Sequence, residues 1–306
     1  MRGPHRNTRR RAFTLIEISI VLIIIALIVG GVLVGQDLIK GAAVRAQIAQ
    51  IEKFNSATNA FKNKYGDLPG DIPDPHASMF GFQARGQYAG EGDGNGKIEG
   101  VGSDAAGQNF GVRECAGETV MFWVDLSAAN LIEGSFTTAS THTPNASNVT
   151  LTSNPNIGAY FPAAKIGGGN YVYAWSQGAQ DSAYIKNSTF NSFGISGGSN
   201  IEIGTCNFFS SPVLAVAQAF AIDKKIDDGL PQTGNVVALF LDWNWQGSGF
   251  TGNWVGAADT SATQGLSTTC YDNGNVTGAT QQYSMEENSG SGQNCALSFQ
   301  MQGAAR

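Results

Sequence analysis

Residues 13–36 read FTLIEISIVLIIIALIVGGVLVGQ, and this stretch decides the fold of the chain. No charge lies between Glu17 and Asp37, and this run spans about 28 Å as a helix, enough to cross the hydrocarbon core of a bilayer. A secretory signal peptide has a shorter apolar region with a small-residue cleavage site behind it, and the small residues near Gly35 and Ala43 fit such a site poorly. We therefore predict an apolar helix that the mature protein retains.

Glu17 is an acid at the very start of this apolar run. An ionised carboxylate in an apolar environment is costly unless it is paired or stays near the membrane interface. In a simple membrane anchor, Glu17 would lie at the level of the lipid headgroups. In a helix that enters a protein assembly, Glu17 would need a cationic partner instead.

Residues 9–17 read RRRAFTLIE, and with the apolar helix behind them they resemble the leader and first helical turn of type IV prepilins and type II secretion pseudopilins. The resemblance implies that a prepilin peptidase cleaves between Ala12 and Phe13 on the cytoplasmic side and that the Phe13 amine is then methylated. Ala12 departs from the glycine that the family usually has before the cut. The resemblance further implies a single-pass inner-membrane precursor that joins other pilin subunits in a periplasmic or extracellular filament.

Cleavage before Phe13 would explain Glu17. The new α-amino group is largely cationic at neutral pH and is costly to bury without a partner. In filaments of the family that the segment resembles, the acid meets the amine of a neighbouring subunit. Such a pair is weak evidence for stability but can specify one axial register among many.

The helix continues beyond the apolar run as an amphipathic segment. Gly66 and Pro69 provide the stop, and one apolar face is expected from residues at helical spacing, namely Val44, Ile48, Ile51, Phe54, Phe61 and Tyr65. Glycines at 30, 31 and 35 are expected either to let the helix melt on assembly or to form close helix contacts. The predicted segments are a basic leader (1–12), an apolar helix (13–35), its amphipathic continuation (36–65) and a globular domain (66–306).

The globular part is rich in Gly, Asn, Ser and Thr, and the whole chain holds 40 glycines. Two further helices are predicted, at 118–131 and at 212–225 with Ser211 as the N-cap. Short β-branched or aromatic runs predict strands at 171–175, 201–205, 236–241 and 297–301. The expected fold class is α+β and type IV pilin-like, in which the long N-terminal helix packs on an antiparallel sheet of an enlarged, loop-rich body.

Charge and cysteine usage point to an exported protein that does not bind nucleic acid. Five of the 18 basic residues lie in the first twelve positions, which leaves 13 basic against 24 acidic side chains in the remainder. A body this acidic would not neutralise phosphates. The four cysteines lack zinc spacing and indicate two disulfides, with four buried free thiols as the alternative. The short separation favours pairing Cys270 with Cys295, which leaves Cys115 and Cys206 as the second pair.

An acidic glycine-rich loop resembles the first half of a calcium loop. Oxygen-bearing side chains alternate with glycines, and the expected ligands are Glu91, Asp93, Asn95, Lys97 and Glu99. The twelfth position, where a bidentate acid belongs, is Gly102, so Glu99 or Asp104 would have to substitute. No cofactor is required, and the alternative to calcium is a solvated glycine turn. A second acidic group, at 223, 227 and 228, is explained by helix capping and a turn at Gly229, with a metal site as the alternative.

The sequence offers little for catalysis. A GxSxG match at 194–198 has no histidine downstream of its serine, and Walker, HExxH and dinucleotide motifs are absent. An aromatic cluster of Trp243, Trp245, Trp254, Phe240 and Phe250 is expected to form core, with a ligand-binding face as the alternative. We predict a structural subunit and no enzyme. The alternatives are a minor pilin or tip adhesin that binds a surface, and a membrane-anchored periplasmic enzyme.

Overall fold

The structure is a computed structural model. It describes residues 14–86, 90–100, 117–137, 156–176, 190–202, 207–242, 251–255 and 269–303, the last range without 275, 277 and 287. The chain divides into two compact units, 1–42 and 43–306. This boundary lies within the first helix, inside the segment predicted as the amphipathic continuation.

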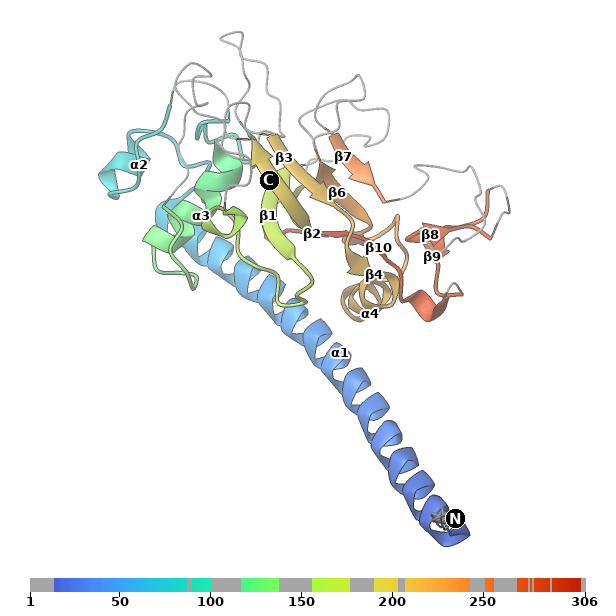
Figure 1. Cartoon of the computed structure of the whole chain (residues 1–306). Helices are drawn as coiled ribbons and strands as arrows, with labels where there is room; N and C mark the ends of the chain where they lie inside the picture. The colour runs from blue at the N-terminus through green and yellow to red at the C-terminus, as the bar shows by residue number, and fades with distance from the viewer. Residues whose placement is uncertain are drawn as a thin grey trace, which may run out of the picture. The chain divides into compact units, whose positions relative to one another are not determined.

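Helix α1 runs from Leu15 to Tyr65 as one continuous element of 51 residues (Figure 1). It ends where predicted, and Gly66 follows in the left-handed conformation, at φ 94°. Gly30, Gly31 and Gly35 are all helical, and beyond the adjoining residues and the backbone of α1 itself, a Cβ placed on any of them would meet no atom within 4 Å. The helix is therefore unbroken in the single chain, while melting on assembly stays a prediction.

The main sheet of the body is antiparallel, and its strand order is β1, β2, β11, β5, with β3 also paired to β2 (Figure 1). Its strands are β1 (Asn170–Ser176), β2 (Asn191–Glu202), β3 (Asn207–Ser211), β5 (Val236–Val237) and β11 (Leu297–Gln300). Three antiparallel pairs complete the described strands: β4 (Leu214–Ala215) with β10 (Gln293–Cys295), β6 (Leu239–Asp242) with β7 (Thr251–Trp254), and β8 (Tyr271–Asp272) with β9 (Gln282–Tyr283). The α+β prediction is confirmed.

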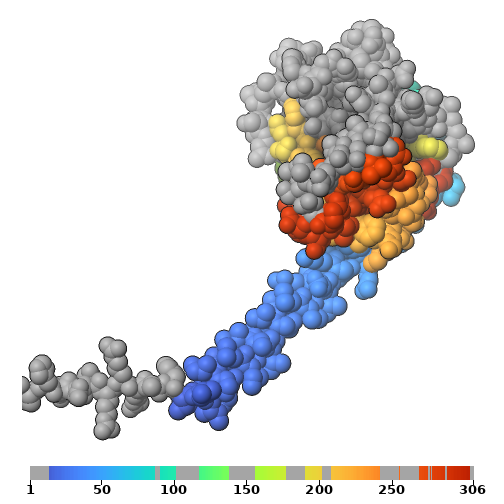
Figure 2. Space-filling view, turned by 90° about the vertical axis from the view of Figure 1, so that its right-hand side faces the viewer, coloured from blue at the N-terminus to red at the C-terminus, as the bar shows by residue number. Residues whose placement is uncertain are grey.

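Three shorter α-helices accompany the sheet: α2 (His76–Met79), α3 (Glu118–Ala128) and α4 (Val216–Ile226), with 3-10 turns at Ile157–Ala159 and Asn288–Gly290. The prediction that α4 begins after Ser211 was wrong. Ser211 ends β3, and Leu214 and Ala215 pair with β10 before the helix starts. Ala215 is the N-cap residue and makes no side-chain cap bond. Figure 2 shows α4 and the C-terminal segment on one face. The ring centroids of Phe220 in α4 and Tyr283 in β9 lie 5.9 Å apart.

The predicted apolar face of α1 forms part of the core within residues 43–306. The ring centroid of Phe54 lies 4.9 Å from that of Trp123 of α3 and 5.9 Å from that of Phe193 of β2. All three rings are buried, and Phe61 further along α1 is fully buried. Large aromatic side chains supply much of the apolar area that such a small sheet can bury. The predicted apolar face is therefore confirmed as the part of α1 that packs on the sheet and on α3.

Cys270 and Cys295 form a disulfide between the segment leading into β8 and strand β10, as the spacing predicted. Cys115 and Cys206 lie outside the described residues. Closing a loop of this length restricts the unfolded chain, so Cys270→Ala with Cys295→Ala should lower the free energy of unfolding by about 3 kcal/mol. Urea unfolding of the variant and the wild type checks this, and a difference below about 1 kcal/mol would contradict it.

Candidate functional site

The N-terminal end of α1 is a capping box built from Thr14 and Glu17. The Thr14 backbone N–H and hydroxyl donate to Glu17 Oε2 at 2.7 and 2.8 Å, and the Glu17 N–H donates to Thr14 Oγ1 at 3.3 Å. This reciprocal bonding satisfies donors that every helix start leaves without partners. The sequence analysis missed this role, although the T-x-x-E spacing ahead of an apolar run is its signature. Glu17 is thus already oriented at the helix start.

The first half of α1 presents an apolar surface on all sides. Seventeen large aliphatic side chains between Leu15 and Ile39 are each 49–89% exposed within the chain. This is the one described helix that is long and apolar enough to cross a membrane. A contiguous exposed apolar surface of this size marks a site of membrane or protein interaction. Ala12 and Phe13, the predicted cleavage site, lie outside the described residues.

The predicted calcium loop lies at a cluster of carboxylates. One carboxylate oxygen from each of Asp71, Asp93 and Glu118 lies within 4.8 Å of the other two. Asp71 follows the end of α1, Asp93 is in the loop, and Glu118 is the first residue of α3. Asp71 is 2% exposed and Glu118 is 0% exposed, whereas Asp93 is on the surface. Three segments distant in the sequence therefore bring their acids to one point.

The loop wraps around the buried acids through its backbone amides. Asp71 Oδ1 accepts from the N–H groups of Gly94 and Asn95 at 2.8 and 3.1 Å, and Asp71 Oδ2 accepts from Gly96 at 2.8 Å. Glu118 accepts from the N–H groups of Gly92 and Glu99 at 3.0 and 2.8 Å. The glycines at 90, 92, 94 and 96 all have positive φ, which side-chain-bearing residues rarely adopt. The repeated glycines are thus what lets the amides converge.

Burial raises the pKa values of these acids. It raises the pKa of Asp71 to about 7, and nearby Asp93 contributes to the rise. Burial raises the pKa of Glu118 well above its ordinary value, with the charge of Asp71 as the second cause. The pKa of Glu99 is also raised by burial, partly opposed by Lys97. A proton or another cation bound among these carboxylates would lower the cost of burying several negative charges together.

Only some of the residues predicted as calcium ligands contact one another in the structure. Asn95 Nδ2 donates to Asp93 Oδ2 at 3.0 Å and to Glu99 Oε2 at 3.5 Å, so its side chain bridges these two acids. Lys97 Nζ lies 3.7 Å from Glu99 Oε1. Glu91 is 1% exposed but does not belong to the close group. Sequence reasoning missed Asp71 and Glu118, which lie outside the loop motif.

The carboxylates of the second acidic group, Asp223, Asp227 and Asp228, all accept hydrogen bonds. Asp223 accepts from Tyr283 Oη at 2.8 Å and from the Gly229 N–H at 3.1 Å. Asp227 accepts from the N–H groups of Asn235 and Val236, and Asp228 from that of Leu230. These bonds close the turn after α4, as the sequence predicted, and one carboxylate oxygen from each of the three acids lies within 4.8 Å of the other two.

Asp223 should make stability depend on pH. Burial raises its pKa to about 7. Asp223 therefore takes up a proton on folding, and its contribution to stability is full at low pH and lost as the pH rises from about 4 through 7. Asp223→Asn cannot ionise, so the variant should gain stability relative to the wild type over this range, by at most about 1.4 kcal/mol per pH unit. Urea unfolding at about pH 5 and pH 8 checks this, and a difference independent of pH would contradict it.

The serine of the GxSxG match is not a nucleophile elbow. Ser196 lies within β2, fully buried, with its hydroxyl 3.3 Å from Tyr173 Oη. A nucleophile of this class instead occupies an exposed strand-to-helix turn. Of the predicted aromatic cluster, Phe240 is 8% exposed and part of the core. The structure does not describe the other members of the cluster, namely residues 243, 245 and 250 and the side chain of residue 254.

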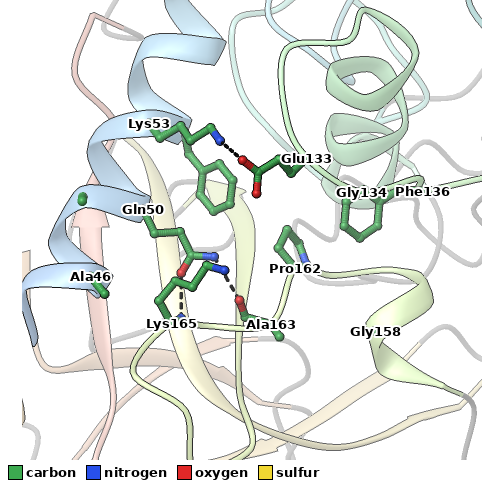
Figure 3. A pocket seen from close by; sticks show the side chains of 12 residues that line it. Ala46, Gln50, Lys53, Glu133, Gly134, Phe136, Gly158, Pro162, Ala163 and Lys165 are labelled. Atoms are coloured by element: carbon green, nitrogen blue, oxygen red, sulfur yellow. Dashed lines mark hydrogen bonds and ion pairs between the residues drawn. The ribbon is translucent and has the colours of Figure 1, made fainter. Parts of the chain in front are cut away.

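A cavity of about 570 Å³ lies beside α1, bounded by the segments that follow α3 and precede β1 (Figure 3). Lys53 Nζ lies 2.7 Å from Glu133 Oε1 at its edge. Gln50 donates to the Ala163 carbonyl and accepts from the Lys165 N–H, both at 2.9 Å. No nucleophile with an adjacent base occurs among its lining residues.

The comparisons with known proteins bear on the N-terminal end alone. Residues 7–33 match the family model described as the prokaryotic N-terminal methylation motif. No curated protein and no solved structure matches the chain. The matched residues include the polybasic segment, the Thr14 and Glu17 capping box and most of the exposed apolar helix. The chain therefore carries the N-terminal signature of type IV prepilins and pseudopilins.

Proposed function

We propose that this protein is a structural subunit that a prepilin peptidase processes and that then polymerises, through its apolar helix, into a type IV pilus or a type II secretion pseudopilus. The observation that carries the proposal is the exposed apolar surface of α1 behind the methylation motif. Such a surface is stable in lipid or in a bundle of like helices and unstable in water. The subunit would accordingly lie in the inner membrane before assembly.

In the assembled filament, Glu17 would pair with the methylated Phe13 amine of a neighbouring subunit. The capping box supports this role because it fixes the carboxylate at the helix start. A carboxylate that is already oriented loses less side-chain entropy when the amine arrives. The pair would then select one axial stagger between adjacent helices.

Imaging of sheared filaments tests the proposal. A label on an exposed residue of the body, such as Lys225 of α4, should mark filaments along their length. A label confined to filament ends would instead favour a tip adhesin. If the protein is absent from filaments and remains unprocessed in the membrane, the proposal is overturned.

A further inference from the structure

We propose that Asn273 is a modification site, where the side-chain amide is lost through attack by the backbone nitrogen of Gly274 with Asp272 as the base. The inference goes beyond the filament role and does not depend on it. The sequence contains two Asn-Gly pairs, at 95–96 and at 273–274. Glycine after Asn favours this reaction because it has no Cβ to shield its own nitrogen. The two pairs allow a comparison within one chain.

The reaction needs the groups of these two residues, a base and water. The Gly274 nitrogen attacks Cγ of Asn273, a new C–N bond closes a five-membered succinimide ring, and the bond from Cγ to Nδ2 breaks. The proton of the Gly274 N–H passes through the carboxylate of Asp272 to the departing amine, which leaves as ammonia. Water then adds to one ring carbonyl and breaks its bond to the nitrogen, which gives aspartate or isoaspartate.

The side chain of Asn273 is not held by a hydrogen bond. Neither Oδ1 nor Nδ2 has a partner within the described part of the chain, although the residue is only 6% exposed. A buried amide without partners is costly. Ring closure removes the two N–H donors of this amide. The unmet donors therefore favour the ring over the reactant.

Asp272 is oriented to act as the base. Its Oδ1 accepts from the Gly274 N–H at 2.7 Å, so the carboxylate contacts the proton that the reaction removes. Its Oδ2 accepts from Ser284 Oγ at 2.5 Å. Asp272 also pairs with Gln282 across β8 and β9, and the Ser284 N–H donates to the Cys270 carbonyl at 3.0 Å. The hairpin therefore holds the carboxylate in place beside the reacting nitrogen.

Gly274 leaves the reacting nitrogen accessible. Its φ is 64°, a conformation that glycine adopts readily. Beyond the adjoining residues, a Cβ placed on Gly274 would meet no atom within 4 Å. Gly274 is exposed, whereas Asn273 is buried, so water can reach the ring from the glycine side once it has formed.

Asn95 shows the opposite arrangement. Its Nδ2 donates to Asp93 Oδ2 at 3.0 Å, and its Oδ1 accepts from the Lys97 N–H at 2.8 Å. Its amide must leave both partners before Cγ can meet the Gly96 nitrogen, which itself donates to Asp71 Oδ2 at 2.8 Å. Breaking the hydrogen bond to the carboxylate of Asp93 should by itself slow the reaction about tenfold or more. The fold therefore protects this pair and not the other.

The test follows both pairs in one sample by peptide mass spectrometry. The full chain in detergent is incubated at neutral pH, both folded and unfolded in urea, and the ring, aspartate and isoaspartate forms are summed at each Asn. In the folded chain, Asn273 should react at least about tenfold faster than Asn95, and a smaller ratio would overturn the proposal. In urea the two rates should be similar. The same ratio in urea would assign the difference to the local sequence and would also overturn the proposal.

Two variants test the roles of the neighbouring acids. Asp272→Asn keeps an oxygen for the Gly274 N–H but is no longer a base, so the reaction at Asn273 should slow about tenfold or more in the folded chain and stay unchanged in urea. Asp93→Ala is the matched control, because it removes the acceptor of the Asn95 amide. It should speed the reaction at Asn95 and leave that at Asn273 as it is.

Melting temperatures show whether the variants fold. If Asp272→Asn folds and Asn273 reacts as in the wild type, Asp272 is not the base and the proposal is overturned. If Asp272→Asn does not fold, the comparison of the two pairs in the wild type decides the outcome alone.

Discussion

Glu17→Gln should abolish filament assembly while the first turn of α1 stays intact. Glutamine keeps a side-chain oxygen for the Thr14 N–H, which now donates to Glu17 Oε2 at 2.7 Å, and Gln serves at this position of a capping box as Glu does. What the substitution removes is the negative charge. A methylated Phe13 amine buried among apolar helices would then have no counter-charge, which costs several kcal/mol per subunit contact. Counting sheared filaments by electron microscopy measures the effect, with membrane insertion as the reference.

Thr14→Val is the matched control because it weakens the cap and keeps the charge. The variant loses the hydroxyl that donates to Glu17 and accepts from the Glu17 N–H. Loss of a cap of this kind costs about 1 kcal/mol. Thr14→Val should therefore still assemble. If Thr14→Val fails and Glu17→Gln assembles, Glu17 acts as a cap and the charge pair is refuted.

Arg85→Met should lower the free energy of unfolding by about 3–5 kcal/mol. Arg85 Nη2 donates to Asp125 Oδ2 at 2.5 Å, and both side chains are almost completely buried. Arg85 also donates through Nε to the Ile72 carbonyl at 2.9 Å, and Asp125 accepts from the Gly70 N–H at 2.7 Å. The pair thus joins α3 to the segment after α1. Without Arg85, a buried carboxylate would have no cation beside it.

The pH dependence and a double variant distinguish charge from packing. Burial raises the pKa of Asp125 to about 6 even beside Arg85. Without the Arg85 cation, the neutral form of Asp125 is favoured further and the pKa of Asp125 rises. The decrease in the free energy of unfolding caused by Arg85→Met should therefore be smaller at about pH 5 than at pH 8. Arg85→Met with Asp125→Leu should recover part of the stability, because an apolar pair avoids the unpaired charge. Equal losses in urea unfolding at both pH values, with no recovery, would assign the effect to packing alone.

The local features of this fold could be read from the sequence. The apolar face from Val44 to Tyr65 follows the helical period, and Gly66 ends α1 as expected. The strands β1 and β11 lie where β-branched and aromatic residues occur. The disulfide between Cys270 and Cys295 follows from a short separation. In each case, neighbouring residues carry the information.

The features that the sequence analysis missed depend on contacts between distant segments. Asp71 and Glu118 are 47 positions apart, and a loop motif cannot show that both acids lie against it. The start of α4 was misplaced because β10, about 80 residues later, pairs with Leu214 and Ala215. The Thr14 cap was different: its signature was present in the sequence, but the methylation motif offered another role for Glu17.

The most direct test of the account is the intact mass and N-terminal sequence of the protein taken from sheared filaments. The account predicts a chain that begins at Phe13, carries one methyl group on its α-amine and retains the whole of α1. A filament-free protein that still begins with residues 1–12 would contradict it.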